Sequence, residues 1–224
     1  QVASLLEKSH EKYSAAMPSL KTMHELAQIL RKRRFRLGSV DFNIPEPEIV
    51  LNEEGRVEKI VVAEHNVAHE LIEEFMLSAN QVVARHLSDI PSIHRIHESP
   101  DEIKLAAFNE FVKGFGYRLM HTQNPGSIDL QNILKKAKGR PEERVVNTLL
   151  LRSMKKARYS EKDPGHFCLA FEHYTHFTSP IRRYPDLVTH RITKSFLNRK
   201  CSAKEKKQLF PIVADCAAQS SFME

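Results

Sequence analysis

The feature that most restricts the fold is a series of helix-length segments in which apolar residues recur every three or four positions. The clearest of these runs from Asn66 to about Leu87, with an apolar stripe that includes Leu71, Phe75 and Ala79. This spacing places the apolar side chains on one face of an α-helix, and Asn is a residue type that caps helix N-termini. The chain is therefore expected to bury the apolar faces of several amphipathic helices against one another.

Other segments show the same pattern, and helix-breaking residues separate them. We expect helices at 18–34, 99–114, 128–138, 142–157 and 185–197. Ser99 is the expected N-cap of the second of these, Ser202 is expected to cap a further helical region, and Pro211 is expected to divide that region into two helices. Apolar runs on either side of "NEEG" predict a β-hairpin over 48–64, and "GHFCLAF" (165–171) predicts a short buried strand. The predicted fold class is α+β: mostly helical, with a β-hairpin and a few short strands that form part of a mixed sheet.

The composition indicates a folded protein and restricts its chemistry only loosely. The chain has 224 residues, and 34 Lys and Arg against 28 Asp and Glu give a net charge of +6. This excess is a weak indication of a polyanionic partner, because many soluble proteins carry as much. The three cysteines show no C-x-x-C spacing, which predicts a reducing compartment and no structural zinc site. We find no membrane-spanning apolar run and no signal-peptide pattern, so the expected location is the cytoplasm.

A stiff turn with two arginines precedes one of the predicted helices, in the stretch "HFTSPIRRYPDL" (176–187). Pro180 fixes its own backbone and restricts the residue before it, so Arg182 and Arg183 follow with little freedom. Planar guanidinium groups held in this way suit phosphate, which they bind through two parallel hydrogen bonds. The alternative is structural: one arginine pairs with Asp186 near the start of the helix. The spacing alone leaves both interpretations open.

Three further patterns have both a functional and a structural interpretation. The basic run "RKRRFR" (31–36) suits contact with a nucleic-acid backbone and also suits the C-terminal end of a solvated helix. Phe42, in a proline-interrupted segment, is either a base-stacking platform or a core residue. Glu73 and Glu74 are either paired carboxylates of an active site or a helix flank that pairs with Lys or Arg. Taken alone, each pattern favours the structural interpretation.

Together these motifs resemble one family. "HFTSPIRRYPDL", preceded by "GHFCLAFEHY", resembles the RNB family of 3′→5′ exoribonucleases. "HELIEEFMLSANQVVARHL" (69–87) is similar to a helix of that family, and "LGSVDF", "LLLRSMKKARY" and "SSFME" also occur in the family order. The resemblance extends over almost the whole chain, and several separate motifs in one order make it specific.

The resemblance implies a hydrolytic, processive enzyme that threads single-stranded RNA into a narrow basic channel and releases nucleoside 5′-monophosphates. By matched position, it implies that Arg182 contacts the phosphates around the scissile bond and that Glu224 is a second catalytic side chain. Phe42 would help to clamp the stacked 3′-terminal bases, and Glu74 would line the same cavity. The expected RNA-binding residues are Phe42, Glu74, Arg183 and Tyr184.

The sequence departs from the family at the metal site. The family carries an aspartate-rich loop upstream of the motifs above, whereas the aspartates here are scattered: Asp41, Asp89, Asp101, Asp129, Asp163, Asp186 and Asp215. We therefore expect residues 1–224 to be a single partial domain, the C-terminal part of an RNB catalytic domain, without the metal loop and without the family's cold-shock and S1 modules. Magnesium is expected in the complete enzyme, with its main ligands absent from this chain and no small-molecule cofactor. Alone, the chain is expected to be inactive, and its oligomeric state is left open.

Two other classes of protein stay open on the sequence alone. One is a helical RNA-binding module in which the arginines and Phe42 hold RNA without cleaving it. The other is an adaptor that keeps the fold and binds a protein. The two differ in a measurable way, because a phosphate binder loses affinity for RNA as the salt concentration rises, whereas an adaptor shows no such affinity.

Overall fold

The computed structural model describes residues 11–42, 44, 47–62, 66–119 and 125–224. In chain order the elements are η1 (Glu11–Ala16), α2 (Met17–Arg36), β1 (Pro47–Leu51), β2 (Val57–Val62), α3 (Val67–His86), β3 (His94–Ile96), α4 (Glu102–Lys113), α5 (Ser127–Ala137), α6 (Glu143–Ser153), β4 (Arg158–Ser160), α7 (Tyr184–Phe196) and α8 (Ala203–Phe222). The predicted α+β class is confirmed. Among the described residues, no helix is both long enough and apolar enough to cross a membrane.

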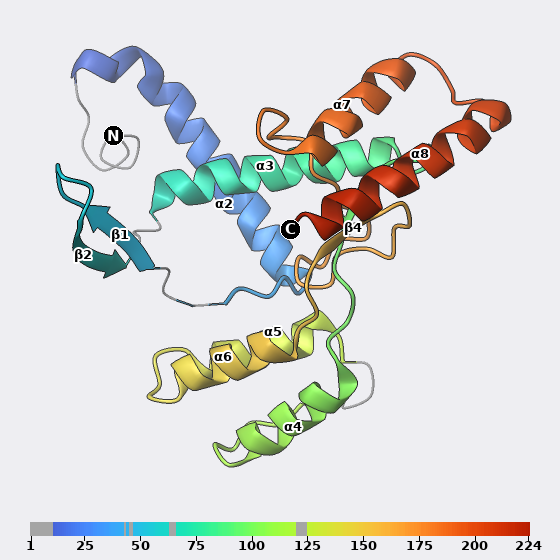
Figure 1. Cartoon of the computed structure of the whole chain (residues 1–224). Coiled ribbons are helices and arrows are strands. Elements are labelled where there is room, and N and C mark those ends of the chain that lie inside the picture. Colours follow the sequence, from blue (N-terminus) through green and yellow to red (C-terminus); the bar gives the residue numbers. More distant parts are fainter. Residues whose placement is uncertain (1–10, 43, 45–46, 63–65, 120–124) are drawn as a thin grey trace.

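The helices form two groups (Figure 1). Helices α2, α3, α7 and α8 make an upper body, and α4, α5 and α6 make a separate lower lobe. The upper body has an apolar core to which α7, α8 and β4 all contribute: Leu87, Ile93, Tyr159, Val188, Ile192, Phe196, Val213 and Ala217. As predicted, Asn66 caps α3, because its side-chain oxygen accepts a hydrogen bond from the N–H of Ala68 at 3.0 Å. The upper body therefore joins elements from both halves of the sequence.

The lower lobe encloses a second apolar core. Its fully buried residues come from all three helices: Val112, Leu130, Ala137, Val146 and Leu150. Helix α4 begins after Asp101, whose carboxylate accepts a hydrogen bond from the N–H of Lys104 at 3.0 Å. The prediction of Ser99 as the cap of this helix is therefore wrong by two residues, because the carboxylate of Asp101 satisfies the free N–H of the first turn.

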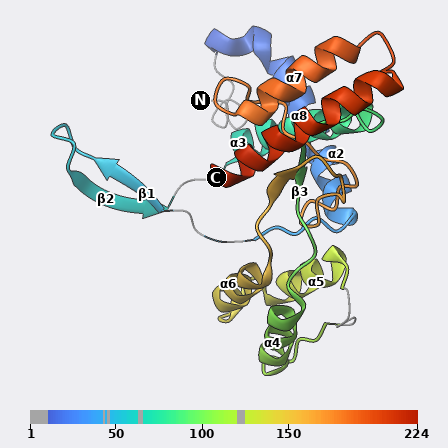
Figure 2. The same ribbon diagram turned by 45° about the vertical axis from the view of Figure 1, so that its right-hand side comes forward.

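The strands form two separate antiparallel pairs. Strands β1 and β2 make the predicted hairpin, with Ile49 opposite Ile60, and the hairpin stands clear of the helices (Figures 1 and 2). Strands β3 and β4 pair inside the upper body, with Arg95 opposite Tyr159. This second pair brings together two segments that lie far apart in the sequence, and it positions the site described below.

The strand predicted over 165–171 is wrong, because this segment forms a tight turn. The N–H of His166 donates to the carbonyl of Phe171 at 2.8 Å, which folds the segment back on itself. Between them, Ala170 adopts a positive φ of 53°, a left-handed conformation that does not occur within a strand. The apolar side chains of this segment pack from a turn instead of a strand.

Two helix boundaries also differ from the prediction. The helix predicted over 142–157 ends at residue 153, since Met154 is extended with a ψ of 148° and leads toward β4. Helix α8 continues through Pro211 and is not divided there. Pro211 is exposed, so water can bond to the carbonyl that its missing N–H leaves free, while Val213 and Ala217 anchor the helix in the core.

Candidate functional site

Residues 179–183, which we call the arginine turn, are fixed by one buried carboxylate. Asp186 has no exposed surface, and its Oδ1 accepts hydrogen bonds from the N–H of Ser179 at 2.7 Å and from Nη2 of Arg183 at 2.8 Å. Arg183 therefore follows the structural interpretation. Arg182 is exposed, and within the described residues its guanidinium group takes part in no hydrogen bond or ion pair. The turn thus presents one guanidinium group that has no partner in the described part of the chain.

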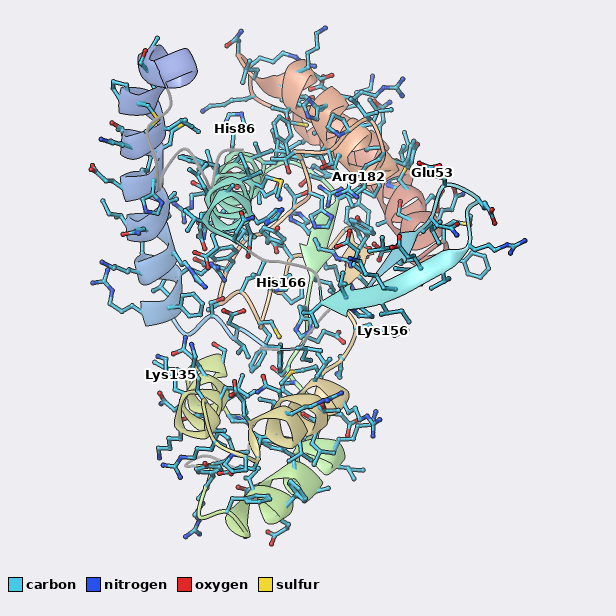
Figure 3. The ribbon with its side chains drawn as sticks, turned by 90° about the vertical axis from the view of Figure 1, so that its left-hand side faces the viewer. Glu53, His86, Lys135, Lys156, His166 and Arg182 are labelled. Atoms are coloured by element: carbon cyan, nitrogen blue, oxygen red, sulfur yellow. The ribbon has the colours of Figure 1, made fainter. Side chains whose placement is uncertain are left out.

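The chain that enters the arginine turn is held from two sides. Asn80 of α3 accepts a hydrogen bond from the N–H of Phe177 at 2.9 Å and donates one to the hydroxyl of Tyr174 at 3.1 Å. His190 of α7 bonds to the carbonyl of Phe177 at 2.8 Å and stacks on its ring, with the ring centroids 3.8 Å apart. These contacts fix the direction from which the chain reaches Arg182, which lies in the upper body (Figure 3).

Glu224 is attached to the β3–β4 pair. Nη1 of Arg95 donates a hydrogen bond to Oε2 of Glu224, and the Arg95 guanidinium group lies over the ring of Tyr159, 4.7 Å from its centroid. Ser221 adds a second attachment, since its Oγ accepts the N–H of Tyr159 at 2.8 Å and donates to its carbonyl at 3.0 Å. The chain end after α8 therefore lies beside β4, as Figure 1 shows.

His176 connects the β3–β4 pair to the arginine turn. Its Nδ1 shares a hydrogen bond of 2.8 Å with the hydroxyl of Tyr159, and the two rings meet edge to face. Burial, followed by the nearby charges of Arg183 and Arg95, lowers the pKa of His176 to about 3. Arg182 is a smaller cause of the same lowered pKa. The site is therefore positively charged around a neutral imidazole.

Glu74 is buried in an ion pair. Its side chain is 4% exposed, and its Oε1 accepts a hydrogen bond from Nε of Arg34 at 3.1 Å. Arg34 also donates from Nη1 to the Oγ of Ser39 at 2.9 Å, so this part of the basic run is internal. Glu74 and Asn80 are six positions apart on α3, or about 9 Å along the helix axis. The pairing interpretation holds for Glu74, and contact with RNA stays a prediction.

Phe42 lies where the upper body meets the lower lobe. It is half-buried and packs against the apolar core of α4, α5 and α6. The residues before it are fixed, because the N–H of Val40 and the Oγ of Ser39 both donate to the carbonyl of Cys168, at 2.7 and 3.3 Å. The described contacts of Phe42 thus belong to the lower lobe, and they do not bring it together with Arg182. Its base-stacking role stays a prediction.

The chain matches known proteins over most of its length. A family model described as RNB domain matches residues 1–199. The chain belongs to the RNB domain family. It is 43% identical to Ribonuclease R of Aquifex aeolicus over 189 residues, which cover 84% of this chain and 27% of that protein. It is also 43% identical to Ribonuclease R 1 of Lactococcus lactis over 223 residues, which cover 97% of this chain and 27% of that protein.

The fold of this RNB chain also matches solved structures. The apo form of Mycoplasma genitalium RNase R superimposes with a TM-score of 0.89 at 31% identity, covering 98% of this chain and 35% of that one. The family resemblance predicted from the motifs is therefore confirmed. The chain spans about a quarter of the length of the curated relatives it matches, at 27% of each of the two named above.

Tyr184 of the RNB chain begins α7 directly after the arginine turn. It is 53% exposed, and its hydroxyl lies 3.6 Å from the sulfur of Cys216.

Clustered metal ligands are absent from the described part of the RNB chain. Within the described residues, no group of three or more His, Cys, Asp or Glu side chains is placed to hold a metal ion. Magnesium binding by the complete enzyme stays a prediction.

The sequence motifs did not identify Arg95 and Tyr159 as parts of the site. Both lie on strands of three residues, which are too short to show an alternating pattern. The available signal was that Tyr159 closes "LLLRSMKKARY", one of the motifs that carry the family resemblance. No comparable signal marks Arg95, because its contacts form only when β3 pairs with β4.

Proposed function

We propose that this RNB chain carries part of the active site of a hydrolytic 3′→5′ exoribonuclease that acts on single-stranded RNA. The observation that carries the proposal is the arginine turn, where buried Asp186 fixes the backbone and leaves the guanidinium group of Arg182 exposed. Membership of the RNB family and the similarity to proteins named Ribonuclease R support it. Mycoplasma genitalium RNase R, solved in complex with ribose methylated single-stranded RNA, has a TM-score of 0.89 to this chain.

In this proposal Arg182 binds the phosphates next to the scissile bond. Negative charge grows on the phosphate oxygens during hydrolysis, and a preorganised guanidinium group stabilises that charge without transferring a proton. Arg183 pairs with Asp186 and supports the turn, and its contact with the RNA backbone is part of the proposal. Tyr184 exposes its ring next to the turn, where it is available to contact the same RNA strand.

Glu224 is the second catalytic side chain of the proposal. Arg95 holds one of its carboxylate oxygens, while the side chain as a whole remains 42% exposed. A carboxylate with one oxygen held and the other open accepts a hydrogen bond from water or from the hydroxyl of a leaving nucleotide in a defined direction. Fixed orientation of this kind contributes to the rate because the reacting groups are already held in the geometry that the reaction requires.

The finer properties of the reaction rest on the family resemblance. We propose that degradation is processive, that the products are nucleoside 5′-monophosphates, and that Phe42 stacks on a base, a contact worth about 1–3 kcal/mol per base. Glu74 is proposed to line the same RNA cavity, as the resemblance implies, and also to hold Arg34 and, through it, the segment at Ser39 that leads to Phe42. A cytoplasmic location also stays a prediction.

Residues 1–224 are proposed to be a partial domain, the C-terminal part of the RNB catalytic domain. The match to the Aquifex aeolicus protein covers only 27% of that protein. The aspartates of the chain are scattered, and the described residues gather no group of three or more metal ligands, so we propose that the main ligands of the expected magnesium ion are not among these residues. We therefore expect the chain alone to hold RNA without shortening it.

A second candidate function is RNA binding without cleavage. Yeast Ssd1, described as a pseudonuclease, has the same fold as this chain, with a TM-score of 0.66 at 23% identity. The fold by itself is therefore compatible with a protein that does not cleave. The two functions differ in whether RNA becomes shorter when the complete polypeptide is supplied with magnesium.

The test incubates 5′-labelled single-stranded RNA with the chain and Mg²⁺ and measures retention on a filter together with RNA length. We expect salt-dependent retention of full-length RNA that Arg182→Ala weakens. The matched control is Arg56→Ala, which removes the same charge from the exposed hairpin and should retain RNA as the unmodified chain does. Equal retention by the unmodified chain and Arg182→Ala would contradict the proposal. Stepwise shortening that Arg182→Ala abolishes would show that the chain completes its own site.

A further inference from the structure

The two proposed catalytic side chains belong to different elements of the fold and need a fixed spacing. Arg182 lies on the arginine turn, whereas Glu224 follows the end of α8. A side chain just beyond a helix end has many rotamers unless something restricts it. In the described residues, the Glu224 carboxylate has one hydrogen-bond partner, the guanidinium group of Arg95.

Arg95 contacts both halves of the proposed site, which are the chain around Glu224 and the segment that leads into the arginine turn. Its side chain bonds to Glu224, and its backbone N–H donates to the carbonyl of Tyr174 at 2.9 Å, on the segment that leads into the arginine turn. Only 17% of its side chain is exposed, and its guanidinium carbon lies over the ring of Tyr159, 4.7 Å from the ring centroid. A guanidinium group packed on a ring keeps a defined orientation and so directs its donors along fixed lines.

Tyr159 makes a second set of links between the same two halves. Its backbone is bonded twice to Ser221, one turn before Glu224, and its hydroxyl is bonded to His176, just before the arginine turn. Its side chain is buried in the core of the upper body, so the ring forms a rigid support under Arg95. The cross-strand pair of β3 and β4 thus joins the elements that carry Arg182 and Glu224.

We propose that Arg95, supported by the ring of Tyr159, is a positioning residue that sets the place of the Glu224 carboxylate relative to the arginine turn. This inference rests on the proposed function, because the place of Glu224 matters for the rate only if Glu224 acts in cleavage. Arg95 is not proposed to touch RNA. Its effect passes through the carboxylate that it holds, and it therefore differs from the effect of a residue that binds phosphate.

The test measures single-turnover cleavage of single-stranded RNA by the full-length gene product that contains residues 1–224. Arg95→Gln should slow cleavage at saturating RNA by roughly 10- to 100-fold, the range expected when a reacting group is misplaced, and should leave the Kd for RNA unchanged. Arg95→Lys should recover part of the rate. In a Glu224→Gln background, Arg95→Gln should cause no further loss, because the carboxylate it positions is already gone.

The control is Arg158→Gln, which removes an arginine from β4 that is 51% exposed and pairs with Glu98 at the surface; it should cleave at the unmodified rate. If Arg95→Gln lowers the thermal midpoint, Arg95→Lys replaces it in the comparison. Slow cleavage by Glu224→Gln with normal cleavage by a folded Arg95 variant would overturn the positioning role and leave the proposed function standing. If Glu224→Gln and the Arg95 variant both cleave at the unmodified rate while Arg182→Ala does not cleave, Glu224 is not a catalytic residue either.

Discussion

The replacement Asp186→Ala tests how the arginine turn is held. It removes an acceptor that is fully buried and leaves two donors without it, the N–H of Ser179 and Nη2 of Arg183. Removing one partner of a buried ion pair costs about 3–5 kcal/mol, and a buried unsatisfied N–H costs about 1–3 kcal/mol. The Arg183 side chain is 25% exposed and can reach water, so we expect the free energy of unfolding to fall by about 3 kcal/mol, toward the lower end of the first range.

The assay is urea unfolding of the chain at neutral pH, followed by filter binding of single-stranded RNA under conditions where each variant is folded. Asp186→Asn keeps an oxygen for Ser179 and should lose about half as much stability. Asp215→Ala, an exposed position on α8, is the matched control and should change little. RNA affinity should fall in Asp186→Ala although Arg182 is intact. Unchanged stability would refute the conclusion that Asp186 holds the arginine turn. Unchanged RNA affinity would refute the role of Asp186 in presenting Arg182.

Three other predictions follow from buried or strained positions. Glu74→Gln should lower the free energy of unfolding by about 3 kcal/mol, because Arg34 loses its buried counter-charge; urea unfolding measures this. The pKa values of His176 and His166 are lowered to about 3 in the folded protein from an ordinary value of 6.5, so the unfolded chain takes up protons first. Stability should therefore be lost as pH falls from about 6.5 toward 3, by at most about 1.4 kcal/mol per pH unit for each ring, and His166→Gln should reduce that slope in urea midpoints. Pro211→Ala should raise the thermal midpoint, because a proline inside a helix costs about 3 kcal/mol relative to alanine.

The sequence predicted the helices well because their signals are local. Asn66 and Ser202 cap α3 and α8 as expected. The predicted apolar stripe of α3 is only partly right, because Leu71 is buried whereas Phe75 and Ala79 are partly exposed, and the buried face also carries Glu74 and Asn80. The failures occurred where tertiary contacts override a local pattern. Residues 165–171 look like a strand by composition, but a backbone hydrogen bond folds them into a turn. Pro211 looks like a helix end, but the core contacts of α8 keep the helix continuous.

The candidate site was only partly accessible to sequence reasoning. The stiff turn that carries the two arginines and the structural alternative, a pair between one arginine and Asp186, were both visible from spacing, and the structure shows that Arg183 makes this pair. The contact of Arg95 with Glu224 was not visible, because it joins positions from a three-residue strand and from the chain after α8. Side-chain contacts between such distant segments depend on packing, which no local pattern encodes.

The most direct test of phosphate binding by Arg182 measures the affinity of the chain for single-stranded RNA over a series of salt concentrations. The measurement compares the unmodified chain with Arg182→Ala and Arg56→Ala. If Arg182 binds a phosphate, its loss should weaken binding and reduce the slope of log affinity against log salt by about 0.7, the value for one phosphate contact on a single strand. Arg56→Ala should leave both unchanged. Identical affinity and slope for the unmodified chain and Arg182→Ala would contradict the claim that the arginine turn presents a phosphate-binding group.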